Sequence, residues 1–256
     1  MEQPVLETHG LTIRFGGHVA VDEVSCAFRP GTLTAIVGPN GAGKTTYFNL
    51  ISGQLRATRG RVSLFGDDIS RLTAPQRTKR GIGRAFQLTN LFPRLSVLEN
   101  VRLAVQARAG VGKNLFTTWR SHTELVARAE HVLQRVALAD KRDTVASTLP
   151  HGDQRKLEVA ILLALEPEVF MFDEPTAGMS VDEVPVVLEL IHQVKAQGDK
   201  TILLVEHKMD VVRSLADRIV VLHQGELVAD GEPEAVIASP IVQEAYLGVA
   251  PAAAHG

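Results

Sequence analysis

The sequence has almost no cysteine, since Cys26 is the single one among 256 residues. No disulfide can form within the chain, which is typical of a protein from a reducing compartment. An excess of basic charge is missing too, because 27 Lys and Arg residues face 29 Asp and Glu residues. Proteins that bind nucleic acid usually carry a basic excess or a basic stripe, so we expect no nucleic-acid partner.

Long apolar runs are also missing. The longest one, residues 159–165, is far shorter than the ~18 residues that a membrane-spanning helix needs, and it suits a buried helix. The N-terminal stretch MEQPVLETHG lacks the basic and apolar parts of a signal peptide. If the protein serves a membrane, we expect it to do so through a partner.

Short apolar runs alternate with amphipathic segments along much of the chain. Strands alternating with helices predict a mostly parallel sheet that is covered by helices. The segments expected to build this core are strands at 33–37, 168–173, 201–205 and 218–222 and helices at 43–52 and 184–196. Residues 5–15, 24–28 and 61–65 predict an antiparallel sheet laid beside it.

The stretch from 88 to 164 lacks strand signals and is expected to be helical. Ser96 and Glu99 have the spacing of a capping box at a helix start, and residues 118–136 predict a second helix. We therefore expect an α/β fold in three parts. These are a nucleotide-binding core with its β layer at 1–87 and 165–235, a helical subdomain at 88–164 and a C-terminal tail at 236–256.

Four basic residues gather just before this helical stretch. Such a cluster usually belongs to a solvated helix face, and this is the interpretation that the sequence favours here. The four are Arg77, Lys79, Arg80 and Arg84.

Residues 38–46 read GPNGAGKTT and satisfy the P-loop pattern G-x-x-x-x-G-K-[ST]. Small residues let the backbone curl so that successive N–H groups point at phosphate oxygens, and the following helix adds its positive N-terminal end. Lys44 can reach the β- and γ-phosphates, and the hydroxyl of Thr45 can bind Mg²⁺. The sequence thus predicts a site for ATP and Mg²⁺, whose nucleotide-binding residues are Gly38, Asn40, Gly41, Ala42, Gly43, Lys44, Thr45 and Thr46.

A second motif, VFMFDE at 169–174, is an apolar strand that ends in two acids. Burying acids is costly unless something uses them. Asp173 can hold Mg²⁺, and Glu174 can accept a proton from an attacking water. The alternative is a surface turn, because Asp-Glu-Pro-Thr favours turns. The P-loop upstream favours the catalytic interpretation.

In the order of its motifs the sequence resembles the nucleotide-binding subunits of ABC transporters over nearly its whole length. Gln87, in GRAFQ, matches the Q-loop glutamine of that family, and His207, in LLVEHKMD, matches the switch histidine. Phe15, in LTIRFGG, falls where the family stacks an aromatic ring on adenine. LPHGDQ at 149–154 takes the place of the signature motif, and EPTAGMS at 174–180 leads into the D-loop.

The resemblance implies a RecA-like P-loop NTPase core with an antiparallel β layer and an inserted helical subdomain. It implies an ATPase in which Glu174, His207 and Gln87 are catalytic, with Thr45, Gln87 and Asp173 at the metal. It also implies a dimer, identical or not, that sandwiches ATP between one P-loop and the signature of the other subunit. The signature residues expected at the nucleotide are Pro150, His151, Gly152 and Asp153.

The partners that the resemblance implies are a second ATPase subunit, two transmembrane permease subunits and, indirectly, a periplasmic solute-binding protein. The expected location is cytoplasmic, peripheral on the inner face of the cell membrane. The alternatives are an exporter ATPase for lipid or lipopolysaccharide and a soluble ABC ATPase of DNA repair or translation.

The signature departs from the usual Leu-Ser-Gly-Gly-Gln. Pro150 replaces the serine, His151 the first glycine and Asp153 the glutamine, while Ser180 stands where the D-loop aspartate belongs. These departures look like the branch that imports branched-chain amino acids, urea and amides.

Overall fold

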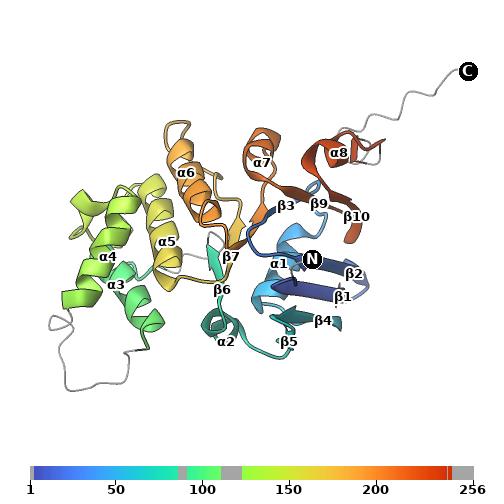
Figure 1. Ribbon diagram of the computed structural model, residues 1–256, viewed down its shortest axis with the longest axis horizontal. Helices are drawn as coiled ribbons and strands as arrows, with labels where there is room; N and C mark the ends of the chain where they lie inside the picture. The colour runs from blue at the N-terminus through green and yellow to red at the C-terminus, as the bar shows by residue number, and fades with distance from the viewer. Residues whose placement is uncertain (1–2, 86–90, 111–122, 241, 244–256) are drawn as a thin grey trace, which may run out of the picture.

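The computed structural model describes residues 3–85, 91–110, 123–240 and 242–243, which form two sheets. The larger sheet has the strand order β10-β9-β3-β8-β7-β6, and the smaller one has the order β2-β1-β4-β5 (Figure 1). Strands of the larger sheet are β3 (Leu33–Val37), β6 (Ile82–Ala85), β7 (Val169–Asp173), β8 (Thr201–Val205), β9 (Arg218–His223) and β10 (Glu226–Gly231). Those of the smaller sheet are β1 (Leu6–Phe15), β2 (His18–Phe28), β4 (Arg59–Leu64) and β5 (Asp67–Asp68).

The larger sheet is parallel except for its edge strand β10, which pairs antiparallel with β9. Because successive side chains of a strand point to opposite faces, each strand packs against two layers. In β7, Phe170 and Phe172 face the helical side, whereas Val169 and Met171 face the smaller sheet. The sheet is therefore buried on both faces, as its continuous apolar strands predict.

Helix α1 (Lys44–Ser52) is packed between the two sheets. Its side chains Tyr47, Phe48, Leu50 and Ile51 share one core with residues of β1, β2, β7 and β8. The hydroxyl of Tyr47 is hydrogen-bonded to Thr8 Oγ1 of β1 at 2.8 Å. The antiparallel sheet thus fixes the direction of the helix that follows the P-loop.

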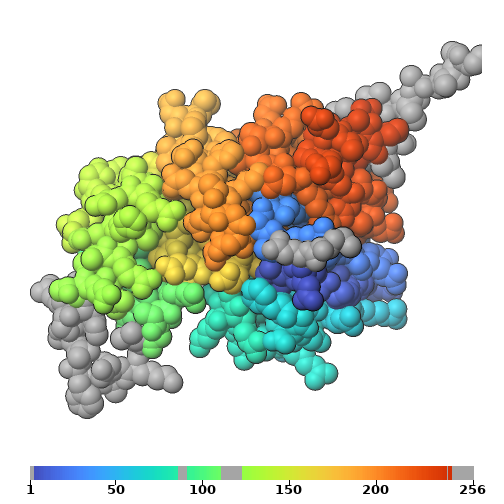
Figure 2. Space-filling model, in the orientation of Figure 1, coloured from blue at the N-terminus to red at the C-terminus, as the bar shows by residue number. Residues whose placement is uncertain are grey.

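Apart from α2, which packs beside α1, the remaining helices cover the other face of the parallel sheet and one end of the molecule. Helices α3, α4 and α5 pack against one another at that end, shown in green to yellow in Figures 1 and 2. The helices are α2 (Ala74–Lys79), α3 (Val97–Arg108), α4 (Thr123–Arg135), α5 (His151–Leu165), α6 (Val184–Lys195), α7 (Met209–Leu215) and α8 (Pro233–Ile237). Short 3₁₀ turns at Ala139–Lys141 and Ala146–Thr148 lead from α4 to α5. Within the described ranges, no helix is both long and apolar enough to cross a membrane.

Most sequence expectations for the fold are confirmed. Strands form at 33–37 and 201–205 as predicted, and the capping box at the start of α3 is present in both directions, from Ser96 to Glu99 and back. The antiparallel layer and the helical insert are there too. The boundary expected at 87/88 lies outside the described residues, so the division at 87/88 and 164/165 stays a prediction.

Two expectations were wrong or incomplete. Arg77 and Arg84 do not lie on a solvated helix face, because Arg77 is buried at 2% exposure and Arg84 points inward from β6. No strand was expected at 82–85, where Gly81 precedes the strand and Gly83 lies within it. Gly83 is required there because an added Cβ would lie 2.4 Å from Leu162 Cδ1 of α5.

Candidate nucleotide site

A tight loop, residues 38–43, joins the end of β3 to α1. At Gly38 an added Cβ would lie 2.1 Å from Leu222 O, and at Gly43 it would lie 2.4 Å from Ala20 O. Gly43 also has a φ of 97°, which residues with a side chain rarely adopt. The two fixed glycines of the motif are therefore required by the close approach of β9 and β2.

Lys44 is the first residue of α1, and its ammonium group folds back over the loop. Its Nζ donates hydrogen bonds to Gly38 O at 2.6 Å and to Pro39 O at 3.0 Å. Burial lowers the pKa of Lys44, an effect that the nearby carboxylates of Glu174 and Asp173 oppose. A partly desolvated cation over the loop can bind the oxygens of a polyphosphate.

The N-terminal end of α1 carries no side-chain cap. Its N-cap residue is Gly43, and the first α-helical hydrogen bond runs from Tyr47 N to Gly43 O at 2.8 Å. The amides of the first turn and the helix dipole together favour an anion at this end. Thr45 is exposed and Thr46 half-buried here. Asn40 and Gly41 are exposed on the loop, whereas Ala42 is buried within it.

Asp173 and Glu174 stand at the carboxyl end of β7, on the same sheet edge as the loop. Asp173 is buried, and burial raises the pKa of its carboxyl group, which Arg84 opposes. Glu174 has a φ of 50°, and its N–H donates to Val205 O at 2.9 Å. Such left-handed backbone is uncommon for a non-glycine residue and often marks a functional site.

Arg84 is a residue of this site that sequence reasoning missed. From β6 its Nη2 donates to Asp173 Oδ2 at 2.6 Å, and both side chains are nearly inaccessible to solvent. Its partner lies 89 residues away along the chain, so no local pattern could have indicated the pair.

Glu206 is a second residue that the sequence did not single out. It is fully buried, and it is hydrogen-bonded to Thr176 Oγ1 and accepts the N–H groups of His207 at 2.8 Å and Lys208 at 3.1 Å. It thereby joins the loop after β8, which carries His207, to the loop after β7. The ring of His207 itself is half exposed, with Nδ1 3.7 Å from Glu206 Oε2.

Phe15 lies at the end of β1 and is 50% exposed, so it is not part of the core. An exposed aromatic ring of this kind is free to stack on a planar ligand. Gln87 lies outside the described residues.

The segment 150–153 lies at the start of α5, where Pro150 is the N-cap. Pro150 and His151 are exposed, whereas Gly152 is buried under Glu183, whose Oε1 would lie 1.7 Å from an added Cβ. Asp153 points inward, because its carboxylate is paired with Lys141 and, at 3.0 Å, with Lys156. At the start of α5, then, Pro150 and His151 are exposed, Glu183 covers Gly152, and the carboxylate of Asp153 points inward.

The oxygen donors at the sheet edge fit a hard divalent cation. Mg²⁺ prefers one or two protein oxygens together with substrate phosphates over a cage made of protein alone. The exposed hydroxyl of Thr45 and the carboxylate of Asp173 are such oxygens. Nowhere among the described residues, the sheet edge included, do three or more His, Cys, Asp or Glu residues gather so that they could hold a metal ion by themselves.

A parallel sheet with a glycine-rich loop, an uncapped helix and two acids at its carboxyl edge defines a P-loop nucleotide-binding protein. The family model of the ABC transporter matches residues 21–177. The LivG high-affinity branched-chain amino acid transport ATP-binding protein of Salmonella typhimurium is 39% identical, over 98% of this chain and 100% of that protein. The chain belongs to the ABC transporter family and is an ATPase.

Solved structures agree. An ATP-binding cassette of an ABC transporter in its ADP conformation superposes with a TM-score of 0.81 at 29% identity, covering 96% of this chain and 100% of that chain. A dimeric ATP-binding cassette in a post-hydrolysis state with ADP and Pi gives a TM-score of 0.76 at 26% identity, covering 89% and 98%. The expected RecA-like P-loop fold is thereby confirmed.

Proposed function

We propose that this chain powers an ABC importer for branched-chain amino acids or a related small solute such as urea or an amide. The observation that carries the proposal is the sheet edge, where the P-loop, Asp173 and Glu174 meet, in a chain that matches LivG along its whole length. The substrate itself rests on that likeness, because the residues at the sheet edge contact nucleotide and carry no information about the solute.

In the proposed mechanism the loop amides, Lys44 and the start of α1 bind the phosphates of ATP, with the ring of Phe15 on adenine. Thr45 and Asp173 would hold Mg²⁺, which neutralises charge on the phosphates. Glu174 accepts a proton from the attacking water, while His207 contacts the γ-phosphate. Gln87 links the site to the helical insert.

A Glu174→Gln variant tests the proposed base. It keeps the shape of the side chain and should bind ATP as the parent does, but its turnover should fall by about 10²- to 10⁴-fold. Isothermal titration and phosphate release measure the two quantities. Glu189→Gln on α6, which lies outside the site, serves as the matched control. Near-parental turnover of Glu174→Gln would remove Glu174 from the mechanism.

We also propose that two such subunits, identical or related, close on ATP. The start of α5, with the exposed Pro150 and His151, would then face the phosphates bound by the other subunit, since the N-terminal end of a helix favours an anion. Support comes from the dimeric cassette described above. Asp153, which is engaged by two lysines, would stabilise the start of α5 and would not contact the nucleotide.

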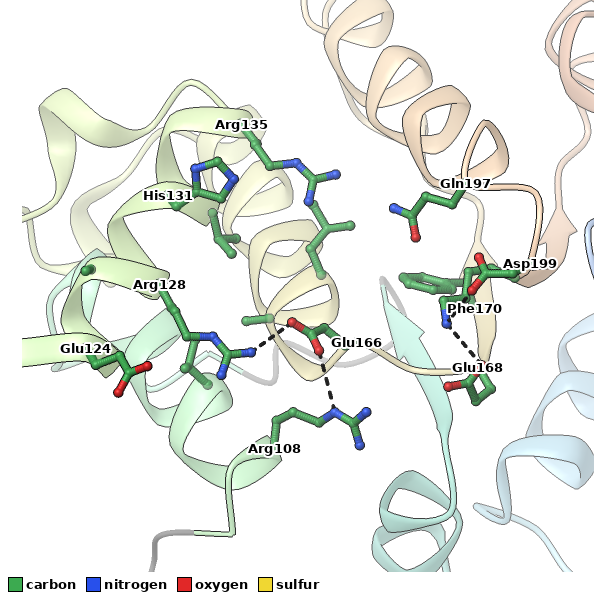
Figure 3. Close-up of a pocket in the computed structure, with 16 residues that line it drawn as sticks. Arg108, Glu124, Arg128, His131, Arg135, Glu166, Glu168, Phe170, Gln197 and Asp199 are labelled. Atoms are coloured by element: carbon green, nitrogen blue, oxygen red, sulfur yellow. Dashed lines mark hydrogen bonds and ion pairs between the residues drawn. The ribbon is translucent and has the colours of Figure 1, made fainter. Parts of the chain in front are cut away.

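The proposed membrane partners dock on the side of the helical insert, with the chain peripheral on the cytoplasmic face. A cleft of about 650 Å³ separates the insert from the core there, with α3, α4 and the end of α5 on one side and β7 and the turn before β8 on the other (Figure 3). Glu166 lies between the walls and pairs with Arg108 and Arg128. If the insert rotates relative to the core when nucleotide binds, the shape of this cleft changes. A partner bound in the cleft would then sense the nucleotide state.

A charge change in the cleft tests this docking. His131 is exposed on α4 and lines the cleft, whereas His192 is exposed on α6 outside it. His131→Glu should reduce co-purification with the membrane subunits and leave the nucleotide affinity of the isolated chain unchanged. His192→Glu should change neither. Equal behaviour of the two variants in co-purification would contradict the proposed docking side.

The solute is tested on the intact complex, purified with its membrane and solute-binding subunits and placed in vesicles. Uptake of labelled leucine that depends on internal ATP is expected, with isoleucine and valine as competitors. ATP-dependent uptake of urea or an amide without uptake of leucine would show that the importer transports one of these related solutes. Outward movement of lipid would contradict import.

A further inference from the structure

Arg84 is held in one orientation by four hydrogen bonds and one ring contact. Its guanidinium lies 5.5 Å from the ring centre of Phe48 on α1. Nη2 donates to Asp173 Oδ2 at 2.6 Å. Nη1 donates to three neutral oxygens in and just after α1, namely Asn49 Oδ1 at 2.7 Å, Ser52 Oγ at 2.9 Å and Gln54 Oε1 at 2.9 Å.

The two edges of the Arg84 guanidinium have partners of different charge. One edge of the guanidinium contacts neutral groups of the helix that carries Lys44 and Thr45, and the other edge contacts one acid. The planar guanidinium, unlike an ammonium, can fix both edges at once. Its strand, β6, pairs with β7, so Arg84 joins the helix that follows the P-loop to the strand that ends in Asp173.

Among the described residues, the hydrogen-bond partner of the Asp173 carboxylate is found at one of its two oxygens. Within the part of the chain that the structure describes, the hydrogen bond given to its carboxylate is the one to Oδ2. A carboxylate held at Oδ2 cannot rotate freely, which leaves Oδ1 in a fixed place on the sheet edge. Polar groups that orient a metal-binding carboxylate in this way set its metal affinity.

We propose that Arg84 is a positioning residue for the metal of the nucleotide site, which acts by holding Asp173 against α1. The inference rests on the metal role proposed for Asp173. A purely structural arginine is built differently in this chain: Arg77 is also buried, and it donates to the carbonyl oxygens of Leu50, Ile51, Ser70 and Leu72 with no acid among them. Arg77 is therefore the matched control.

The test measures the affinity of the full chain for ADP with Mg²⁺ and again with EDTA. Arg84→Lys keeps the charge but cannot hold both edges. Without metal its affinity for ADP should match the parent within about twofold, whereas the gain in affinity from Mg²⁺ should shrink by about tenfold or more. Arg77→Lys should lower thermal stability and keep the full gain from Mg²⁺. An unchanged gain in Arg84→Lys would overturn the proposal.

A mutant cycle shows whether Arg84 acts through Asp173. In an Asp173→Asn background, Arg84→Lys should change the gain from Mg²⁺ by no more than about twofold. If the same tenfold loss persists there, Arg84 acts by another route and the proposal is wrong. If Asp173→Asn keeps the full gain, the metal role of Asp173 fails, and the proposal fails with it. A parent chain that binds no ADP would contradict the proposed function, a result distinct from both.

Discussion

The two ends of α1 are built in opposite ways. At the N-terminal end a glycine stands at the cap position, so the cap residue has no side chain that could accept from the first turn. At the C-terminal end Arg77 donates to the carbonyls of Leu50 and Ile51, both at 2.7 Å, and so satisfies groups that a helix terminus leaves open. Burial lowers the pKa of Arg77 to about 10. The chain thus supplies the compensating charge at one end and leaves the other end for phosphate.

The largest effect on ligand binding is expected at the N-terminal end of α1, the open end, which has no side-chain cap. Lys44→Ala removes the cation that faces the phosphates and should weaken ATP binding by about 100-fold or more. Stability should fall by no more than about 1 to 2 kcal/mol, because two loop carbonyls, the buried Gly38 O and the part-buried Pro39 O, lose one donor. Nucleotide titration and thermal melting measure the two quantities. A variant that melts far lower but binds ATP normally would reverse the comparison.

At the C-terminal end of α1, the closed end, where Arg77 caps the helix, we expect the opposite pattern: a loss of stability without a loss of ATP binding. Arg77→Met leaves buried carbonyl groups without a donor and should lower the free energy of unfolding by about 3 kcal/mol. The affinity of the folded fraction for ATP should stay within about threefold of the parent. Denaturant unfolding measures the loss, with Arg80→Met as the control, since the side chain of Arg80 is exposed and pairs with Asp67, which is exposed too. A loss in Arg77→Met no larger than in Arg80→Met would show that the closed end needs no cap.

A smaller effect should separate two glycines of the open end. Gly43→Ala places a methyl group 2.4 Å from Ala20 O and should cost about 2 kcal/mol or more. Gly41 has a similar φ, 80° against 97° at Gly43, but the methyl group of Gly41→Ala would have no atom within 4 Å. Its cost should be about 1 kcal/mol. Equal losses in the two variants would show that backbone strain alone, and not the approach of β2, explains the motif glycine.

Much of the fold followed from the sequence because its signals are local. The strands at 33–37 and 201–205 are apolar except for Thr34 and Thr201, and both faces of each are buried, so a short apolar run was enough to predict them. The phosphate loop followed from spacing. Strand β6 did not, since Gly83 is there to admit Leu162, a contact across 79 positions that no window contains.

The candidate site divides along the same line. Lys44, Asp173 and Glu174 were predicted because their motifs carry the chemistry in a few consecutive residues. Arg84 and Glu206 were missed because each works through a distant partner, Asp173 and Thr176 respectively. The cluster of basic residues in the sequence predicted a solvated position for Arg84, and this prediction was wrong.

The loop at 38–43 and the uncapped start of α1 are proposed to bind the terminal phosphates of a nucleotide, and the rest of the mechanism depends on this binding. A titration series with ATP, ADP, AMP and adenosine, each with Mg²⁺, tests it most directly. ATP and ADP should bind at least about 100-fold more tightly than AMP and adenosine, because of the four ligands only these two bring a β-phosphate to the loop. Equal affinity for all four would place recognition on the base and sugar and contradict the account.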